Sequence, residues 1–423
     1  MIMRFAFAIA VLACSQAAPS PAGEIAANAH WPRWRGPQDN GSTTVGSYST
    51  EFNTSKNVLW KTSLPGTGCS TPTVSKGSIL LTCPVDGQDT VINFDWDGKV
   101  KWRAEIGSQI PGKHRNSSGS NPSVVIDGDR LFAYFKSGNL AELDPSGKIV
   151  WQTNLKKFAK DTLFFDLGTS PITTKQCLVV AVMHNGESFL VAYEKGTGKQ
   201  KWYVSRNYKT PVEGDHSYAT PIVTDHMGME SILVWGAEHL TAHDAVNGEL
   251  IWSCSGFNPD GADNWVAVGS HVIAGDIAIV PYGRGSRLAG IKLGGEGDVT
   301  ETHRLWTRKD TGSFVPTPLV HNGRVYVLRD RGEVECIDPK TGKTLWKDAL
   351  PKHRAKYYAS PVVAGDHLYA AREDGVVFVA GIKGGFKLVS ENDMGERLIA
   401  SPVPVANRLL IRGAEHLFCI GSK

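Results

Sequence analysis

The feature that most constrains the fold of this chain is a sequence unit that recurs about every 40 to 50 residues. The segment from Thr317 to Trp346 shows the unit most clearly, because turn signals divide it into four short pieces in which apolar residues alternate with polar ones. The unit is therefore predicted to be a meander of four antiparallel strands. Their predicted bounds are Thr317–Val320, Arg324–Arg329, Glu333–Asp338 and Lys343–Asp348.

Each copy opens on a proline that usually follows serine or threonine, and most copies close on a tryptophan. The opening prolines are Pro72, Pro122, Pro171, Pro221, Pro318, Pro361 and Pro402, and His271 stands at the equivalent place in one further copy. These openings lie 50, 49, 50, 50, 47, 43 and 41 residues apart. The closing tryptophans are Trp102, Trp151, Trp202, Trp252, Trp306 and Trp346. We interpret these tryptophans as packing between neighbouring copies, because they occupy the same place in each.

Four strands per copy at this period are typical of a β-propeller, and the openings predict eight blades. The last copy, from Ser401, has room for three strands, whereas Val58–Thr62 resembles an isolated fourth strand. We therefore predict an all-β, eight-bladed β-propeller with four antiparallel strands per blade. The N-terminal strand pairs with the C-terminal blade and closes the ring, which leaves no free sheet edge. The seventh copy lacks its tryptophan near Phe386, so we expect looser packing there.

The N-terminus is typical of an export signal, with Arg4, a short apolar core and small residues. We predict a signal peptide over 1–22, an N-terminal arm over 23–56 and the propeller over 57–423. No other apolar run reaches membrane length. The protein is thus expected to be periplasmic or extracellular, with the alternative of a lipoprotein anchored through Cys14, because the residues before it resemble a lipobox.

Composition argues against several classes of function. The formal net charge is only +3 and no basic run occurs, so nucleic acid is not an expected partner. The seven cysteines show no Cys-x-x-Cys spacing, which excludes a c-type haem and the familiar zinc sites. A hairpin that pairs Val74 with Ser78 would place Cys69 opposite Cys83, so these two cysteines are a candidate disulfide. Two separate buried thiols are the alternative.

The segments that lead into the first strand of each blade should open onto one mouth of the central channel. Four of these segments are rich in polar and aromatic residues, and a fifth adds tyrosines. The candidate ligand-binding residues are His114, Arg115, Asn116, Asp166, Asp215, His216, Tyr218, Asn264, Trp265 and Tyr357. They could form a funnel that binds a ligand. The alternative is that these segments bond to their own backbones and simply plug the ring.

The repeat resembles the PQQ-like (pyrroloquinoline-quinone-type) β-propeller repeat family. The resemblance is carried by the Ser/Thr-Pro openings and by Asp338-Pro339-Lys340-Thr341-Gly342 before the closing tryptophan. Trp31-Pro32-Arg33-Trp34 and Gly297-Asp298-Val299-Thr300 are similar to an exported subgroup of that family. The resemblance implies the fold, whereas the family contains both quinoprotein dehydrogenases and non-enzymatic scaffolds. One branch is the propeller lipoprotein of the outer-membrane barrel-assembly machinery.

Three functions follow from these observations. The first is an exported, non-catalytic and monomeric propeller that binds a protein partner or a small ligand, including a carbohydrate, at the channel mouth. The second is a PQQ-dependent oxidoreductase that acts on alcohols or sugars. The sequence shows no recognisable calcium or quinone site and no adjacent-cysteine ring to cover a quinone, so no cofactor or metal is assigned. The third is a carbohydrate-binding or hydrolytic propeller, and hydrolysis would need Asp166 or Asp215 as the acid or nucleophile.

Overall fold

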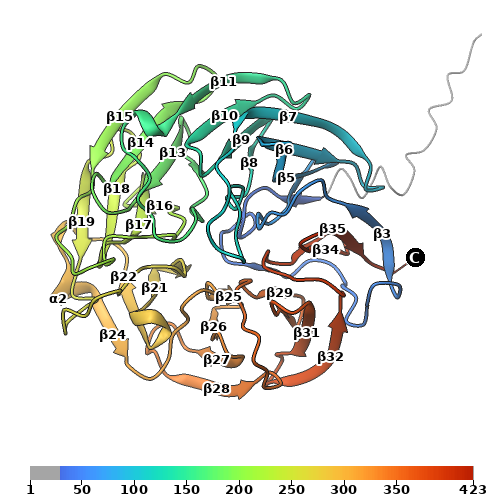
Figure 1. Ribbon diagram of the computed structural model, residues 1–423. Helices are drawn as coiled ribbons and strands as arrows, with labels where there is room; N and C mark the ends of the chain where they lie inside the picture. Colours follow the sequence, from blue (N-terminus) through green and yellow to red (C-terminus); the bar gives the residue numbers. More distant parts are fainter. Residues whose placement is uncertain (1–28, 423) are drawn as a thin grey trace, which may run out of the picture.

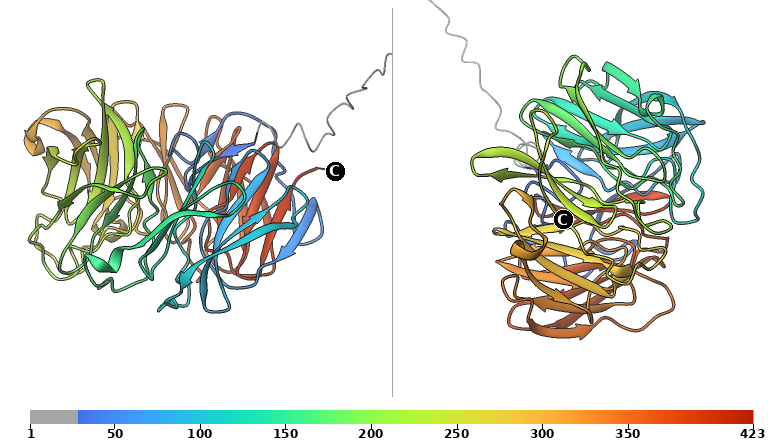
Figure 2. Two further views of the ribbon diagram at one scale, coloured as in Figure 1. Left: turned by 90° about the horizontal axis from the view of Figure 1, so that it is seen from above. Right: turned by 90° about the vertical axis from the view of Figure 1, so that its left-hand side faces the viewer.

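The computed structural model describes residues 29–422, so the predicted signal peptide and Cys14 lie outside the described residues. Eight antiparallel meanders form a closed ring around a central axis (Figure 1). The ring is wider than it is thick, and its loops project from two opposite faces (Figure 2). This is the eight-bladed propeller that the repeat predicts. Among the described residues, no helix is both long and apolar enough to cross a membrane.

The blades follow one another in chain order, and each runs from the axis outward. Blade 1 consists of β4 (Thr73–Ser75), β5 (Ser78–Val85), β6 (Gln88–Phe94) and β7 (Val100–Ser108), and blade 2 consists of β8 (Val125–Asp127), β9 (Arg130–Tyr134), β10 (Asn139–Leu143) and β11 (Ile149–Asn154). Blade 3 consists of β12 (Ile172–Thr173), β13 (Cys177–Val182), β14 (Phe189–Glu194) and β15 (Gln200–Ser205), and blade 4 consists of β16 (Ile222–His226), β17 (Met229–Gly236), β18 (His239–Asp244) and β19 (Leu250–Cys254).

The second half of the ring repeats this order. Blade 5 consists of β20 (Val272–Ala274), β21 (Ile277–Tyr282), β22 (Arg287–Lys292) and β24 (Arg304–Arg308), and blade 6 consists of β25 (Leu319–His321), β26 (Arg324–Leu328), β27 (Glu333–Ile337) and β28 (Thr344–Ala349). Blade 7 consists of β29 (Val362–Ala364), β30 (His367–Ala371), β31 (Val376–Gly381) and β32 (Lys387–Asp393), and blade 8 consists of β33 (Val403–Val405), β34 (Arg408–Arg412), β35 (His416–Ile420) and β3 (Val58–Ser63). In blade 6 the observed strands match the predicted ones to within two residues at each end.

The N-terminal strand closes the ring as predicted. Strand β3 pairs antiparallel with β35, and Trp60 lies opposite Cys419 in the register. Because β3 precedes blade 1 and β35 ends blade 8, this pairing joins the two ends of the chain within one sheet. The closure gives blade 8 the same four-stranded meander that every other blade has, to which three blades add a short fifth strand.

The serine or threonine at most blade openings has a role that its recurrence did not reveal. Its backbone N–H donates to the hydroxyl oxygen at the opening of the next blade. For example, the N–H of Ser270 donates to Thr317 Oγ1 at 2.9 Å, and the N–H of Thr317 donates to Ser360 Oγ at 2.9 Å. Such links run from blade 2 round to blade 1, where the N–H of Ser401 donates to Thr71 Oγ1 at 3.2 Å. Since an unpaired buried N–H is costly, these hydroxyls satisfy the inner end of each blade.

The closing tryptophans pack between blades, as their recurrence indicates. Trp306 of blade 5 donates from Nε1 to the carbonyl of Pro339 in blade 6 at 2.8 Å. The ring of Trp306 lies so close to Gly342 that a Cβ there would be 2.5 Å from Trp306 Cδ2. Trp102 has the same relation to Pro145 and Gly147 of the following blade. The tryptophan of the preceding blade packs in this way on the turn glycine at five places, namely Gly98, Gly147, Gly198, Gly248 and Gly342.

Blade 7 differs from the expectation of looser packing. The N-terminal arm fills the place where its tryptophan is missing. Phe52 is buried with Val379 of blade 7 and Phe418 of blade 8. The N–H of Phe52 donates to Asn392 Oδ1 at 2.8 Å, and Asn392 Nδ2 donates to the carbonyl of Thr50 at 3.1 Å. The expectation was wrong because the replacement ring comes from a distant part of the chain.

The rest of the arm adds short strands to the inner edges of two blades. Strand β1 (His30–Trp31) pairs antiparallel with β4, and β2 (Ser42–Thr43) pairs parallel with β29. Between them Arg35 is buried, and its Nη2 donates to the carbonyl of Pro361 at 3.0 Å. The arm thus crosses the end of the channel opposite the loops that lead into the blades.

The register in blade 1 corrects the argument for a disulfide. Val74 pairs with Ile79, not with Ser78, and this shift of one residue no longer places Cys69 opposite Cys83. Both cysteines are free thiols. Cys69 Sγ donates to the carbonyl of Asn116 at 3.2 Å, whereas Cys83 Sγ donates to the carbonyl of Gly66 at 3.1 Å.

Candidate functional site

The ten candidate ligand-binding residues all lie on segments that lead into inner strands, at the face of the ring opposite the N-terminal arm. These segments are the β7–β8, β11–β12, β15–β16, β19–β20 and β28–β29 connections. The structure brings several of these residues into contact, but it buries others in roles that leave them unable to reach a ligand.

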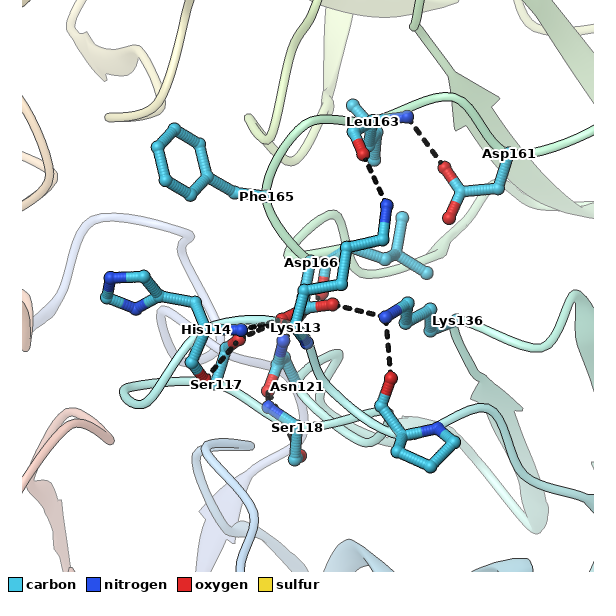
Figure 3. Close-up of polar contacts among 12 residues, drawn as sticks. Lys113, His114, Ser117, Ser118, Asn121, Lys136, Asp161, Leu163, Phe165 and Asp166 are labelled. Atoms are coloured by element: carbon cyan, nitrogen blue, oxygen red, sulfur yellow. Dashed lines mark hydrogen bonds and ion pairs between the residues drawn. The ribbon is translucent and has the colours of Figure 1, made fainter.

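Asp166 is the centre of a hydrogen-bonded cluster that joins two of these connections (Figure 3). Its carboxylate receives the Nζ of Lys136, the hydroxyl of Ser117 and the backbone N–H of Lys113 at 2.7 Å and of His114 at 3.1 Å. Lys136 also donates to the carbonyl of Pro111 at 2.6 Å. The side chains of Lys136 and Asp166 are 2% and 0% exposed, so this is a buried ion pair.

These contacts determine the protonation state of Asp166. Burial alone would raise its pKa, but the hydrogen bonds from Lys136, Ser117 and the two backbone N–H groups overcome this effect and hold the pKa below its usual range. A carboxylate that is buried, ionised and fully engaged can neither donate a proton nor attack a sugar. The glycosidase hypothesis therefore has no support from Asp166.

The β7–β8 connection also contacts blade 7, which blade 8 separates from blade 1. Asn116 Nδ2 donates to Glu373 Oε2 at 3.0 Å, and Arg115 Nη2 lies 3.4 Å from the same oxygen. Glu373 Oε1 accepts the backbone N–H of Lys356 at 3.1 Å. Since Glu373 lies in the β30–β31 hairpin, the loop between blades 1 and 2 is joined to blade 7, past the intervening blade 8. Arg115 and Asn116 make this link between the two segments.

Three aromatic rings connect blades 2, 3 and 4 at the same face. His114 meets the ring of Phe165 edge-on with centroids 5.8 Å apart, and Phe165 lies 6.2 Å from Tyr218. The hydroxyl of Tyr218 accepts the backbone N–H of Phe165 at 2.9 Å. Burial raises the pKa of Tyr218, so this hydroxyl stays protonated. Tyr218 thus holds the β11–β12 connection through this hydrogen bond.

His216 and Asp215 are adjacent but poorly placed for catalysis. The distance between His216 Nε2 and Asp215 Oδ1 is 3.9 Å, and the imidazole is buried. Burial lowers the pKa of His216, and the charge of Asp215 opposes this shift without reversing it. His216 is therefore neutral at pH 7. Its buried ring cannot reach a ligand above the mouth without rearrangement.

The remaining candidates serve the loops in which they lie. Trp265 Nε1 donates to the carbonyl of Phe257 at 2.7 Å, and the guanidinium of Arg287 lies 5.6 Å from its ring. Asn264 donates its N–H to the carbonyl of Val212 at 2.7 Å. Tyr357 is fully buried in the core of blades 6 and 7. The contacts of these three residues do not bring their side chains together around one pocket.

Sequence reasoning missed Lys136 and Glu373, the partners that organise this face. The sequence did contain a signal for Lys136, because this lysine directly follows the apolar run Leu131–Phe135 at the end of the second strand of its blade. Glu373 had none, since its partners Arg115 and Asn116 are more than 250 residues away. Phe164, which lies beside Phe165, is the most exposed aromatic residue of the face at 69%.

The residues of this face do not fit a calcium-bound quinone. Asp166 already accepts four donors, Tyr218 is hydrogen-bonded to the backbone, and Arg287 lies over Trp265. Within residues 29–422, one group of carboxylate and imidazole side chains is close enough to hold a metal, namely Glu396, Glu415 and His416. There, the carboxylate of Glu396 accepts hydrogen bonds from the backbone N–H groups of Glu415 and His416 at 3.0 and 3.1 Å. Glu396 therefore already stabilises the loop that contains these two residues.

The comparisons with known proteins agree with the observed fold and show the family to which the chain belongs. The profile of the family described as outer membrane protein assembly factor BamB matches residues 39–210, 146–299 and 297–398. The chain belongs to this family. It is 22% identical over 318 residues to BamB of Moranella endobia, which covers 74% of this chain and 76% of that protein. It is 24% identical over 358 residues to BamB of Burkholderia pseudomallei, which covers 81% and 84%.

Solved structures share the fold at lower identity. BamB from Moraxella catarrhalis superimposes with a TM-score of 0.62 at 16% identity, covering 86% of this chain and 99% of that one. A europium-containing methanol dehydrogenase superimposes with a TM-score of 0.70 at 12% identity, covering 93% and 91%. At such identities these likenesses show a common architecture. They transfer no dehydrogenase chemistry to the present chain.

Proposed function

We propose that this protein is a non-catalytic scaffold of the bacterial envelope that binds a protein partner on the loop face of the ring. The family supports an envelope location and a role in assembly, since its relatives are outer membrane protein assembly factors. The observation that carries the proposal is the exposed pair Phe164 and Phe165 on a connection that the buried Asp166–Lys136 ion pair anchors. Exposed aromatic anchors on a rigid support are typical of protein interfaces.

A protein partner explains this face better than a small ligand does. The hydrogen bond from Asn116 to Glu373 engages two polar side chains of this face with each other, whereas Phe164 projects into solvent. Val212 on the next connection is also exposed. A projecting apolar residue gains most by entering a pocket on a partner, because about 25 cal/mol is gained per Å² of apolar surface buried.

Basic residues on two other connections of the same face indicate the chemistry of the partner. Five basic residues of the β7–β8 and β28–β29 connections are exposed on this face. They are Lys113, Arg115, Lys352, Arg354 and Lys356. The matching surface would therefore combine an apolar pocket with acidic residues, and the association rate would fall as salt rises.

The test is site-specific photocrosslinking in cells of the native host, with a photoreactive phenylalanine analogue at position 164. Position 246 is the matched control, because Val246 is similarly exposed at 66% but lies in the β18–β19 turn. We expect a crosslink from position 164 to an outer-membrane assembly component and none from position 246. Crosslinks of equal yield from both positions, or none from 164, would contradict the proposal.

The oxidoreductase hypothesis has a separate test. Purified protein with added calcium and quinone should not transfer electrons from primary alcohols or aldoses to an artificial acceptor. Quinone-dependent turnover that is lost in His216→Ala would establish the alternative and remove the scaffold proposal.

A further inference from the structure

A second cleft lies on the opposite face of the ring, between the N-terminal arm and the inner hairpin tips of blades 6 and 8. Its volume is about 1030 Å³. The arm forms one wall through residues 37–48, and the hairpin turns at His321–Asn322 and Ala406–Asn407 form the other. Inner strands begin at the loop face and end at these turns, so the cleft and the aromatic pair are at opposite ends of the ring.

The walls of this cleft are fixed by hydrogen bonds between segments that are distant in sequence. Ser42 Oγ donates to the carbonyl of Val320 at 2.8 Å, and the N–H of Val320 donates to the carbonyl of Asn40 at 3.0 Å. On the other side, the N–H of Ser47 donates to Asn407 Oδ1 at 2.9 Å. The arm is therefore held to both blades, and the cleft is a preformed feature of the fold.

None of the residues that line this cleft is aspartate, glutamate, lysine or arginine. Its two histidines, His30 and His321, are neutral at pH 7, because burial lowers the pKa of each. A charged ligand would lose hydration here without meeting an opposite charge, which is unfavourable. In a protein with 21% charged residues, a lining without charge selects a neutral ligand.

The polar groups of the cleft both donate and accept hydrogen bonds. The side chains of Gln38, Asn40, Asn322 and Asn407 are amides, and Thr44 carries a hydroxyl. Gln38, Thr44 and Asn322 are exposed. Vicinal hydroxyl groups need such donor–acceptor pairs, while the partly buried ring of Tyr48 offers an apolar surface for the C–H face of a sugar ring.

We propose that this cleft binds a neutral, hydroxyl-rich ligand, namely a short segment of an oligosaccharide. Its volume is at the upper end of the roughly 300–1,000 Å³ of small-molecule sites, which suits a few linked sugar rings. The ligand lies along the arm and contacts the amides of both walls. This activity is independent of the partner site on the loop face, so the protein can hold a glycan and a protein partner at the same time.

The test uses the mature protein on an array of neutral, acidic and sulfated oligosaccharides, followed by calorimetry with the neutral chain that binds best. The variant Gln38→Ala with Thr44→Ala removes two exposed polar side chains from the cleft. We expect it to bind about 10-fold or more weakly, which corresponds to about 1.4 kcal/mol. Gln152→Ala, an exposed glutamine on β11, is the matched control and should bind as the parent does.

Three results would overturn the proposal. These are the absence of binding by any neutral oligosaccharide, binding confined to charged glycans or to peptides, and neutral binding that the double variant leaves unchanged. Phe164→Ala separates this inference from the proposed function, since it should weaken partner binding and leave the sugar affinity intact.

Discussion

Lys136 and Asp166 form an ion pair whose side chains are 2% and 0% exposed, and this pair holds two connections together at the loop face. Burying two charges is costly, so such a pair is stable only when hydrogen bonds satisfy both members. Here the backbone N–H groups of Lys113 and His114 donate to Asp166, and the carbonyl of Pro111 accepts from Lys136. Asp166 is therefore a positioning residue that supports the exposed Phe164 and Phe165, and its value to function is indirect.

Asp166→Ala should destabilise the protein by about 3–5 kcal/mol, because it leaves the ammonium of Lys136 buried without a counter-charge. The matched control is Asp129→Ala. Asp129 pairs with Lys76 at 2.7 Å, but both side chains are largely exposed, so its loss should have little effect on stability. Urea denaturation measures both. Equal losses would mean that burial of the Lys136–Asp166 pair has no energetic consequence.

The same pair predicts an acid dependence. The pKa of Asp166 is lower in the folded than in the unfolded protein, so its stabilising effect is present above the unfolded value, near 4. The effect is lost as the pH falls through the lower folded value. The difference in unfolding free energy between parent and Asp166→Ala should therefore shrink between pH 5 and pH 3. A constant difference over this range would contradict the assigned ionisation.

The packing of tryptophan on glycine makes a second prediction. Gly342 has a φ of +68°, and a Cβ would lie 2.5 Å from Trp306. Gly365 has a φ of +59° and open space around it. Both alanine substitutions incur the left-handed backbone penalty of about 1–2 kcal/mol, but only Gly342→Ala also displaces a ring. We expect Gly342→Ala to lower the melting temperature clearly more than Gly365→Ala does.

This prediction depends on Trp306 as the clashing group. In a background of Trp306→Ala, which itself should cost about 3–5 kcal/mol, the extra loss from Gly342→Ala should disappear. Additive losses in the double variant would show that the two residues are not coupled.

The repeat predicted the fold well because every blade is a local unit whose openings, turns and tryptophan are spaced along the sequence. Closure of the ring by Val58–Ser63 was predictable for the same reason, since a missing strand at one end matched an extra strand at the other. The role of Phe52 in blade 7 was not, because the substitution of a tryptophan by a residue more than 300 positions away leaves no periodic trace.

The sequence indicated where the ten candidate residues lie on the ring, but it did not reveal the contacts that they make. Loop connectivity alone placed the ten residues at one face, whereas their roles depend on partners such as Lys136 and Glu373. Burial of those partners follows from tertiary packing. For Cys69 and Cys83 the error was a register shift of one residue, which turns every side chain of a strand to the other face.

The cysteines provide a direct test of that correction. Cys69 and Cys83 are free thiols, and burial raises the pKa of Cys69 to about 11, so its reactive thiolate is scarce at pH 8. In protein purified without reductant, we expect both thiols to react slowly with iodoacetamide when folded and completely after denaturation. Peptide mapping that finds a peptide linked through both positions would contradict the free-thiol assignment.

The last prediction concerns two histidines that must remain neutral. Burial lowers the pKa of His271 to about 3 and that of His243 to about 4. Their pKa values in the unfolded chain are near 6.5, so below pH 6.5 the unfolded state binds protons that the folded state does not bind. The free energy of unfolding therefore decreases as the pH is lowered. Each histidine should reduce the free energy of unfolding by about 2 kcal/mol at pH 5 relative to pH 8.

Seven blades carry proline at the place of His271, so His271→Pro is compatible with the backbone of the ring and removes one of these groups. We expect the variant to gain about 2 kcal/mol over the parent at pH 5 beyond any difference at pH 8, measured by urea denaturation at both values. An equal gain from His271→Pro at both pH values would mean that His271 is already protonated in the folded protein or stays neutral in both states, and the assigned burial would then be wrong.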